Sequence, residues 1–304
     1  MNRCVCTLMA VLLILIYGLV GPREAMAETF VDAVGRHVRI NGPPKRIVSL
    51  APSVTEILYY LGLGDRIVGV TMFSDFPRDA LAKPRVGSYA HLNVERILEL
   101  EPDLAVGTKD GNEPNAVALL EQAGLPVYIV NPRHVEDVAD TLFSVARLCR
   151  VEEKGKRLAE SLTSRIKAVK EAVKNLPKPS VFIQINIKPI ISVSRHTIHN
   201  DVIRLAGGRN VMEDASVTYP TVSVEELLAR KPEVIIISSM ERGGRFEKAK
   251  REWMIWKSIP AVRNNRVYLV NSDILDRPSP RIIDGLETVA RLLHPEIGRN
   301  QRTE

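Results

Sequence analysis

Histidine and aspartate side chains are the groups in this sequence whose spacing could support metal or acid–base chemistry. His196 and His199 lie three residues apart, so they could share one face of a helix or turn. A catalytic zinc site needs a third protein ligand, and none stands nearby. Asp273, Asp276 and Asp284 do not form a paired-carboxylate arrangement suited to general acid–base catalysis. The sequence therefore favours a structural or solvated role for both histidines.

Motifs of common enzyme and nucleotide-binding sites are absent from the sequence. No G-x-G-x-x-G follows an expected strand, and no G-x-x-x-x-G-K-[ST] occurs. H-E-x-x-H, C-x-x-C and G-x-S-x-G are also missing. The formal net charge of +6 is scattered rather than gathered into a basic block, and aromatic residues make up 5%. We therefore expect no nucleic-acid partner and no enzymatic activity.

Short apolar strands alternate with helical segments along most of the chain, and this alternation must position any site. It is typical of parallel βαβ units, and so predicts an α/β fold. Ser53 and Glu56 fit a capping box that opens the first helix. A polar hairpin is expected at 30–41. The first strands are expected at 46–50, 67–71, 103–107 and 126–130.

A long helical segment lies near the middle of the sequence. Residues 152–176 carry a single apolar stripe, and a helix of about 25 residues would span roughly 37 Å, more than one lobe needs. The strand–helix alternation begins again after Pro179. We interpret 151–177 as a rigid bridging helix between an N-terminal lobe (28–150) and a C-terminal lobe (178–304). An ordinary packing helix on one lobe is the alternative.

The two halves of the sequence also resemble each other. The segment NVERILELEPDL is echoed by SVEELLARKPEV 130 residues later, which pairs Glu95 with Glu225. A second echo pairs 127–131 with 267–271. Chance similarity between generic βα units is the alternative. The echoes favour two lobes of like topology, with a cleft between them where a ligand would bind.

The N-terminus has the layout of a secretory signal peptide, predicted to cover residues 1–27. Arg3 precedes an apolar run over 8–20, and Ala25-Met26-Ala27 is a small-residue cleavage site. The run is short against the roughly 20 residues that span a bilayer, so cleavage is favoured over an uncleaved anchor. Only Cys149 remains afterwards, in an apolar helical pattern, and no intramolecular disulfide can form. We therefore expect a periplasmic protein.

Several separate motifs resemble one known family. RIVSLAPSVTEIL from Arg46, SDFP from Ser74, GGRNV from Gly207 and SPRI from Ser279 look like segments of the helical-backbone periplasmic binding proteins. This family serves importers of cobalamin, ferric siderophores and haem, and the resemblance covers residues 44–294. SDFP and RPSPR look most like the cobalamin-binding branch. The resemblance implies two Rossmann-like α/β lobes bridged by a single long α-helix.

The resemblance also implies how such a receptor meets its importer. In relatives, one acidic residue on each lobe pairs with arginines on the two permease subunits, and the matching positions are Glu95 and Glu225. The alternative is that each acid only complements a helix dipole. Asn93 and Ser223 are expected N-caps. Ser223 could form a capping box with Glu226, which would leave Glu225 facing outward.

Ligand contacts follow from the same resemblance. Phe73, Tyr89 and Tyr219 match positions where cobalamin-binding relatives place aromatic rings against the corrin. Asp273 and Arg277 match polar contacts on the opposite wall. Flat rings with a few polar groups suit a large, mostly apolar macrocycle that carries amide side chains.

Four other residues depart from that pattern or lie outside it. Thr108 and Ile185 stand where relatives have aromatic residues. Trp253 and Trp256, the two tryptophans, lie elsewhere. Trp253, Ile255 and Ile259 are interpreted as core or packing residues. These departures bear on the identity of the cargo rather than on the receptor role.

The sequence thus predicts an extracytoplasmic receptor that captures cobalamin or a related corrinoid and delivers it to an ABC importer. The partner would be a permease dimer with its ATPase subunits, and the receptor a monomer without a cofactor or metal of its own. A ferric siderophore or haem is the alternative cargo, because Arg195, Arg277 and Arg281 could bind an anionic siderophore. An enzyme using the same cleft is less favoured.

Overall fold

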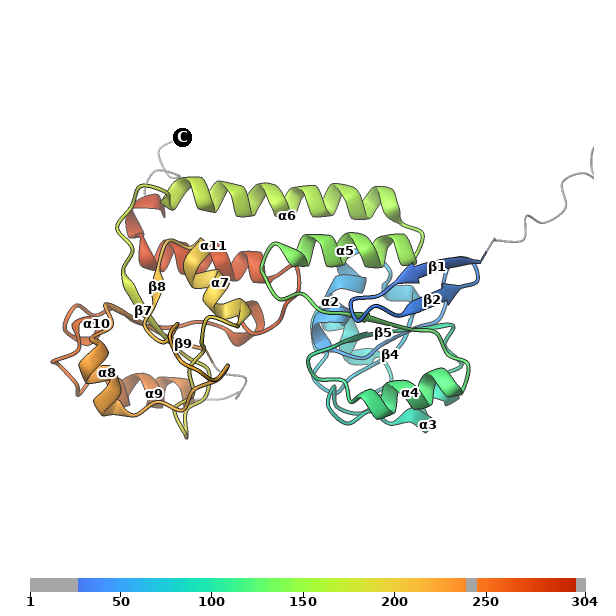
Figure 1. Cartoon of the computed structure of the whole chain (residues 1–304), viewed down its shortest axis with the longest axis horizontal. Helices are drawn as coiled ribbons and strands as arrows, with labels where there is room; N and C mark the ends of the chain where they lie inside the picture. Colours follow the sequence, from blue (N-terminus) through green and yellow to red (C-terminus); the bar gives the residue numbers. More distant parts are fainter. Residues whose placement is uncertain (1–26, 239–244, 299–304) are drawn as a thin grey trace, which may run out of the picture.

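A parallel four-stranded sheet forms the centre of each of two lobes in the computed structural model, which describes residues 27–238 and 245–298 (Figure 1). The N-terminal lobe contains β1 (Glu28–Val31), β2 (His37–Ile40), β3 (Ile47–Ser49), α2 (Pro52–Tyr60), β4 (Ile67–Val70), α3 (Val94–Glu99), β5 (Leu104–Thr108), α4 (Pro114–Gln122), β6 (Val127–Val130) and α5 (Asp137–Leu148). The C-terminal lobe contains β7 (Ser180–Gln184), α7 (Ile198–Leu205), β8 (Arg209–Asn210), α8 (Val224–Arg230), β9 (Val234–Ile237), α9 (Arg245–Trp253), α10 (Pro260–Arg263), β10 (Val267–Leu269) and α11 (Ile282–Leu293). The predicted α/β class is therefore confirmed.

The two sheets have the same strand order. It is β4-β3-β5-β6 in the first lobe and β8-β7-β9-β10 in the second, so each strand has a counterpart. The first sequence echo falls on α3–β5 and α8–β9, and the second on β6 and β10. The echoes therefore mark equivalent elements, as expected. The hairpin β1–β2 is the one antiparallel pair of strands in the described ranges and is added to the first lobe alone.

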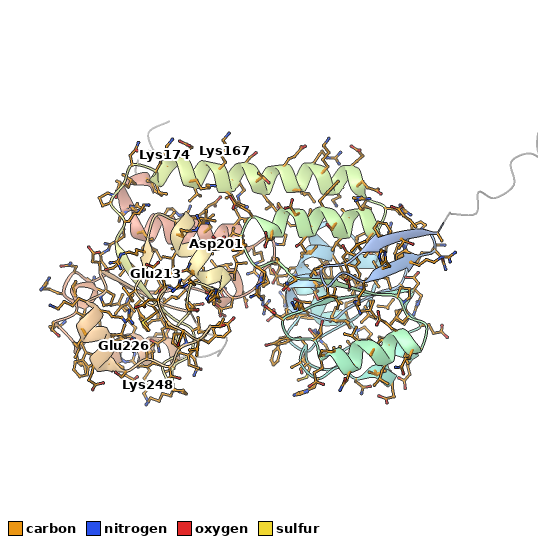
Figure 2. All side chains as sticks on the ribbon, in the orientation of Figure 1. Lys167, Lys174, Asp201, Glu213, Glu226 and Lys248 are labelled. Atoms are coloured by element: carbon orange, nitrogen blue, oxygen red, sulfur yellow. The ribbon has the colours of Figure 1, made fainter. Side chains whose placement is uncertain are left out.

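Helix α6 (Glu152–Val173) crosses from one lobe to the other (Figure 1). Its 22 residues span about 33 Å. Leu162, Ile166 and Val169 are buried on one face, while Lys167 and Lys174 point away from the lobes (Figure 2). The helix ends at Val173, a few residues before the predicted end at 177. Pro177 and Pro179 follow, and a residue that precedes a proline disfavours the helical conformation.

Beneath α6 the two lobes share one apolar core. Buried side chains from α2 and α5 of the first lobe pack in the same cluster as those from α7 and α11 of the second. Representative members are Ile57, Leu142, Ile166, Val202 and Leu286. Because packed interiors resist deformation, this shared core favours a rigid junction with small opening motions.

Helix α2 begins differently from the expected capping box. Its N-cap is Ala51, no side chain caps it, and Pro52 occupies the first turn. Proline is favoured there because its missing N–H would have no partner in the helix anyway. Ser53 and Glu56 therefore do not form the predicted box. The Glu56 carboxylate is buried and faces the other lobe.

Trp253 and Cys149 are buried packing residues, as the sequence indicated. Trp253 is buried, donates from Nε1 to Gln184 Oε1 at 2.7 Å, and meets the Phe182 ring edge-on at 6.0 Å. Cys149 is buried at the end of α5, and burial raises the pKa of its thiol to about 12. Neither residue is available to a ligand in the cleft. Ile259 is also buried, whereas Ile255 is 71% exposed, so the packing role predicted for Ile255 is wrong.

The predicted signal peptide falls almost wholly on residues 1–26, which lie outside the described part of the chain. It stays a prediction. Across residues 27–238 and 245–298, no helix is both long and apolar enough to cross a bilayer.

Candidate ligand-binding cleft

A cleft of about 830 Å³ opens between the two lobes. It is lined by residues at or after the carboxyl ends of the strands, such as 51–53 after β3, 110–111 after β5 and 131–133 after β6. The second lobe contributes 196–199 at the start of α7, and 272–273 and 276–278 after β10. In parallel α/β sheets, ligands bind outside this edge. The volume lies within the usual range of small-molecule sites.

All five residues expected to contact a ligand line this cleft. Phe73 and Tyr89 come from the first lobe, and Tyr219, Asp273 and Arg277 come from the second. The structure therefore brings together residues that are up to about 200 positions apart in the sequence. That they contact a ligand remains a prediction.

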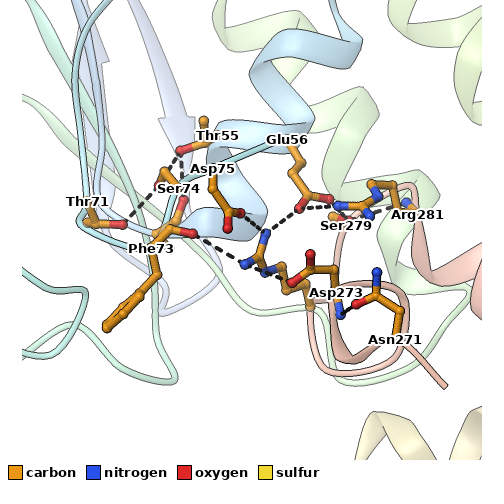
Figure 3. Close-up of polar contacts among 12 residues, drawn as sticks. Thr55, Glu56, Thr71, Phe73, Ser74, Asp75, Asn271, Asp273, Ser279 and Arg281 are labelled. Carbon is orange, nitrogen blue, oxygen red and sulfur yellow. Dashed lines mark hydrogen bonds and ion pairs between the residues drawn. The ribbon is translucent and has the colours of Figure 1, made fainter. Parts of the chain in front are cut away.

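Phe73 stands on a loop whose flanking residues are pinned. Thr71 and Ser74 are buried and their hydroxyl groups lie 3.0 Å apart, and Thr55 of α2 donates to Ser74 Oγ at 2.9 Å. Arg85 donates to the carbonyl oxygens of Thr71 and Ser74, at 2.9 and 2.8 Å. Phe73 itself is 54% exposed. The loop thus presents an apolar ring to the cleft on a fixed backbone (Figure 3).

Tyr89 is held by the loop after β5. Asn112 donates from Nδ2 to Tyr89 O at 2.7 Å and to Leu50 O at 2.8 Å, and its Oδ1 accepts from Thr108 N at 2.8 Å. Gly111 has a φ of +126°, and a Cβ there would lie 2.3 Å from the Tyr89 ring. The ring therefore packs against bare backbone. Gly111 and Asn112 were not identified from the sequence, which has no motif that marks them.

Tyr219 provides a third ring, from the opposite wall. Its loop is attached to the second lobe by backbone hydrogen bonds from Ser192 to Pro220 and from Ser194 to Thr218. Burial raises the pKa of the Tyr219 hydroxyl above its usual value, and the Asp110 carboxylate of the first lobe adds to the effect. The hydroxyl is therefore protonated at neutral pH.

Arg277 contacts protein groups through both terminal nitrogens of its guanidinium. Its Nη1 contacts Glu56 Oε1 and Asp75 Oδ1, both at 2.9 Å. Its Nη2 donates to Phe73 O at 3.3 Å and pairs with Asp273 Oδ1 at 3.0 Å. The side chain is 12% exposed. Arg277 thus borders the cleft, but its hydrogen bonds to Glu56, Asp75 and Phe73 link the two lobes.

Glu56 lies at the margin of this site, although its sequence pattern had predicted a helix-capping role. Besides Arg277, it accepts from Ser279 Oγ at 2.5 Å and Arg281 Nη1 at 3.2 Å. Burial raises the pKa of its carboxyl, while the hydrogen bonds from Ser279 and Arg277 act in the opposite direction. The Ser-x-x-Glu pattern gave no sign of this role, because all three partners lie more than 200 residues away.

Charged groups elsewhere on the cleft walls are also paired. Arg133 contacts Asp110 at 3.0 Å within the first lobe. His199 is buried and lies 2.9 Å from Asp276, which also accepts from Ser238 Oγ at 3.0 Å. Within the described ranges, no cluster of three His, Cys, Asp or Glu side chains could hold a metal ion. These histidine contacts fit the structural role expected for His199.

Two arginines considered for an anionic ligand do not line the cleft. Arg195 donates to the carbonyl oxygen of Glu213 at 3.0 Å. Arg281 contacts Glu56 and stacks over the Phe76 ring at 3.9 Å. Their positions leave Arg133 and Arg277, each with carboxylate partners, as the arginines that border the cleft in the described part of the chain.

Glu95 and Glu225 lie on equivalent helices, α3 and α8, each in the first turn and each exposed. Asn93 and Ser223 cap these helices, accepting from the backbone N–H groups three residues on, at 2.8 and 3.1 Å. Glu226 turns toward Arg230 rather than completing a reciprocal box. Both helices lie on the side of the lobes away from α6 (Figure 1).

Two sheets of like order, a bridging helix and a cleft at their carboxyl edges define a two-lobed solute receptor. The family described as "Periplasmic binding protein" matches residues 47–274, and the chain belongs to it. The vitamin B12-binding protein of Vibrio campbellii is 35% identical over 265 residues, which is 86% of this chain and 93% of the relative. That of Vibrio parahaemolyticus is 34% identical, over 81% and 88% of the two chains.

Solved structures show the same architecture. The crystal structure of the periplasmic vitamin B12 binding protein BtuF of Vibrio cholerae has a TM-score of 0.74 and 34% identity, covering 83% of this chain and 97% of the other. The periplasmic haem-binding protein RhuT from Roseiflexus sp. RS-1 has a TM-score of 0.75 and 25% identity, covering 83% and 99%. The fold inferred from the sequence motifs is thereby confirmed.

Proposed function

We propose that this protein is a periplasmic receptor that binds cobalamin or a related corrinoid in the inter-lobe cleft and delivers it to an ABC importer. The observation that carries the proposal is the cleft itself. Three aromatic rings (Phe73, Tyr89 and Tyr219) face a space whose bordering arginines already have carboxylate partners. The relatives named as vitamin B12-binding proteins support the same cargo.

The charge pattern favours an amide-bearing macrocycle over an anionic chelate. Binding carboxylates or catecholates would require arginine donors not already committed. Arg277 is paired with three carboxylates, and Arg133 with one. Flat rings can instead lie against a corrin, while carboxylates such as Asp110 and Asp273 can accept from neutral amides.

Glu95 and Glu225 are the positions we assign to permease docking. Their equivalence by strand order, their exposure and their common side of the molecule suit a partner with two like subunits. Delivery would then occur outside the cytoplasmic membrane, after removal of residues 1–27, with a single receptor molecule on each permease dimer and its ATPase subunits. The receptor would carry no cofactor besides its ligand.

The cargo is tested by expressing the full-length gene, purifying the exported protein and titrating it with cyanocobalamin, haem and several ferric siderophores by calorimetry. We expect one cyanocobalamin per protein and much weaker heats with the other ligands. Tight siderophore or haem binding without cobalamin binding would overturn the choice of cargo. Ligand consumed over time, rather than bound in a fixed ratio, would indicate an enzyme instead.

A further inference from the structure

The polar cluster at the inner end of the cleft joins segments that belong to different lobes. Glu56 lies in helix α2 of the first lobe and is 3% exposed. Its three partners, Ser279, Arg277 and Arg281, belong to the segment that leads into α11 of the second lobe. Every hydrogen bond to this carboxylate from a described side chain therefore crosses the lobe boundary (Figure 3).

A second set of contacts from the same C-terminal segment reaches the loop that carries Phe73. Arg277 contacts Asp75 Oδ1 at 2.9 Å and the carbonyl oxygen of Phe73 at 3.3 Å. The Arg281 guanidinium lies 3.9 Å above the Phe76 ring. Two arginines of one lobe thus contact both α2 and the 73–76 loop of the other, and Arg277 also holds Asp273 of its own wall.

The cluster lies between the shared core and the cleft. Glu56 precedes Ile57, and Arg281 precedes Ile282, and both isoleucines are buried in the core that spans the lobes. Arg277 and Asp273 border the cleft. The apolar core joins the lobes beneath α6, whereas this cluster joins them where the two walls begin to separate.

We propose that Glu56 is a positioning residue of the cleft, whose carboxylate ties α2 to the 277–281 segment and thereby fixes the separation of the walls that carry Phe73 and Asp273. The inference deepens the proposed function, since it concerns the same cleft. It rests on that function only where ligand affinity is measured. A carboxylate is required because one acceptor group must satisfy two guanidinium groups and a hydroxyl together.

The separation of the walls is measured without ligand by electron–electron double resonance between two spin labels. Leu119→Cys on α4 and Ala229→Cys on α8 place one exposed label on each lobe, and Cys149 is buried and will not compete. We expect a single narrow distance distribution in the otherwise unchanged protein. Glu56→Gln should broaden it and lengthen its mean, because the neutral amide loses the charge that attracts both arginines and its NH2 group cannot accept the hydrogen bond from Ser279 Oγ.

An ion pair outside the cleft supplies the matched control. Glu99→Gln removes the Arg96 pair, which lies within α3 of one lobe, and should leave the distance distribution unchanged. Arg277→Met should reproduce the effect of Glu56→Gln from the other side, and it carries the test if Glu56→Gln does not fold by circular dichroism. The double variant should be no broader than either single variant, because partners in one interaction are not additive.

Affinity provides the functional readout. If greater freedom of the walls reduces the fraction of molecules that can bind ligand to about one tenth, the apparent affinity for cyanocobalamin falls about tenfold. An unchanged distance distribution in folded Glu56→Gln and Arg277→Met would overturn the positioning role, whatever the ligand. A broadened distribution in a protein that binds no cobalamin would support the positioning role and count against the proposed cargo alone.

Discussion

Gly111 lies directly beneath the ring of Tyr89, so close that a Cβ at position 111 would stand 2.3 Å from Tyr89 Cδ2. Its φ of +126° adds a second demand that only glycine meets without strain. We expect Gly111→Ala to displace the ring and to destabilise the protein by about 1–3 kcal/mol. Cyanocobalamin affinity should fall by more than the fraction of unfolded protein explains. Parallel urea denaturation and calorimetric titration separate the two effects, with Gly124→Ala, which has open space and a φ of +84°, as the control for backbone strain.

Removal of the exposed rings should weaken binding without unfolding the protein. Phe73 and Tyr219 are 54% and 55% exposed, so little packing is lost in Phe73→Ala or Tyr219→Ala. Aromatic anchors at binding sites typically contribute 2 kcal/mol or more, which corresponds to roughly thirtyfold in affinity. Calorimetric titration measures the change. Val217→Ala, an exposed apolar residue outside the cleft lining, should retain full affinity.

Reversal of charge at Glu95 and Glu225 should act on the importer rather than on the ligand. Both residues are exposed and outside the cleft, so Glu95→Lys with Glu225→Lys should leave cyanocobalamin affinity intact. Receptor-stimulated ATPase activity of the reconstituted importer should be lost. Glu160→Lys and Glu171→Lys, exposed on α6 and so on the opposite side of the molecule from α3 and α8, serve as the matched charge control. Stimulation that survives the double reversal would remove the docking assignment.

The buried Glu56 carboxyl makes stability depend on pH in a definite direction. Its pKa is raised above the ordinary 4.5, chiefly by burial. A raised folded-state pKa means that the protonated form is favoured in the folded protein, so this contribution is complete below about pH 4.5 and is lost as pH rises through the folded pKa. The free energy of unfolding of the unchanged protein minus that of Glu56→Gln should therefore decrease from about pH 4 toward neutrality.

Urea denaturation of both proteins across that range gives the difference directly. If the difference instead grows with pH, the ion pairs to Arg277 and Arg281 outweigh burial, and the pKa is lowered rather than raised.

Cys149 should be inert in the folded protein. Burial raises the pKa of its thiol to about 12, which keeps the reactive thiolate scarce at about pH 8. A disulfide reagent should therefore label no thiol of the exported protein in buffer and one thiol in concentrated urea. Rapid labelling in buffer would mean that the end of α5 opens readily.

The elements that could be predicted from the sequence are those whose signal is local. Alternating apolar strands and helices and the apolar stripe of α6 each lie within a few tens of residues, as does each segment of the echo, and each corresponds to observed elements. Each pattern arises because one face of a helix or strand is buried, and a short window of sequence already shows this periodicity. The C-terminal end of α6 was placed a few residues too far because the helical pattern continues beyond Val173.

The site could be predicted only in part, because its contacts join distant segments. Phe73, Tyr89, Tyr219, Asp273 and Arg277 were inferred through family motifs rather than from their own surroundings. The Ser-x-x-Glu pattern at Ser53 suggested a helix cap, yet Pro52 in the first turn and Ser279 across the lobe boundary decide what Glu56 does. No local pattern reports a partner more than 200 residues away.

The continuous core beneath α6 has a consequence for how this molecule loses its structure. Side chains of both lobes and the bridging helix bury one another, so neither lobe retains an intact apolar face when the other opens. The protein should therefore melt as one cooperative unit, with equal calorimetric and van't Hoff enthalpies, despite its two sheets. A segment limited to residues 28–150 would expose the faces of α2 and α5 that the second half covers, and it would not persist as an independent domain.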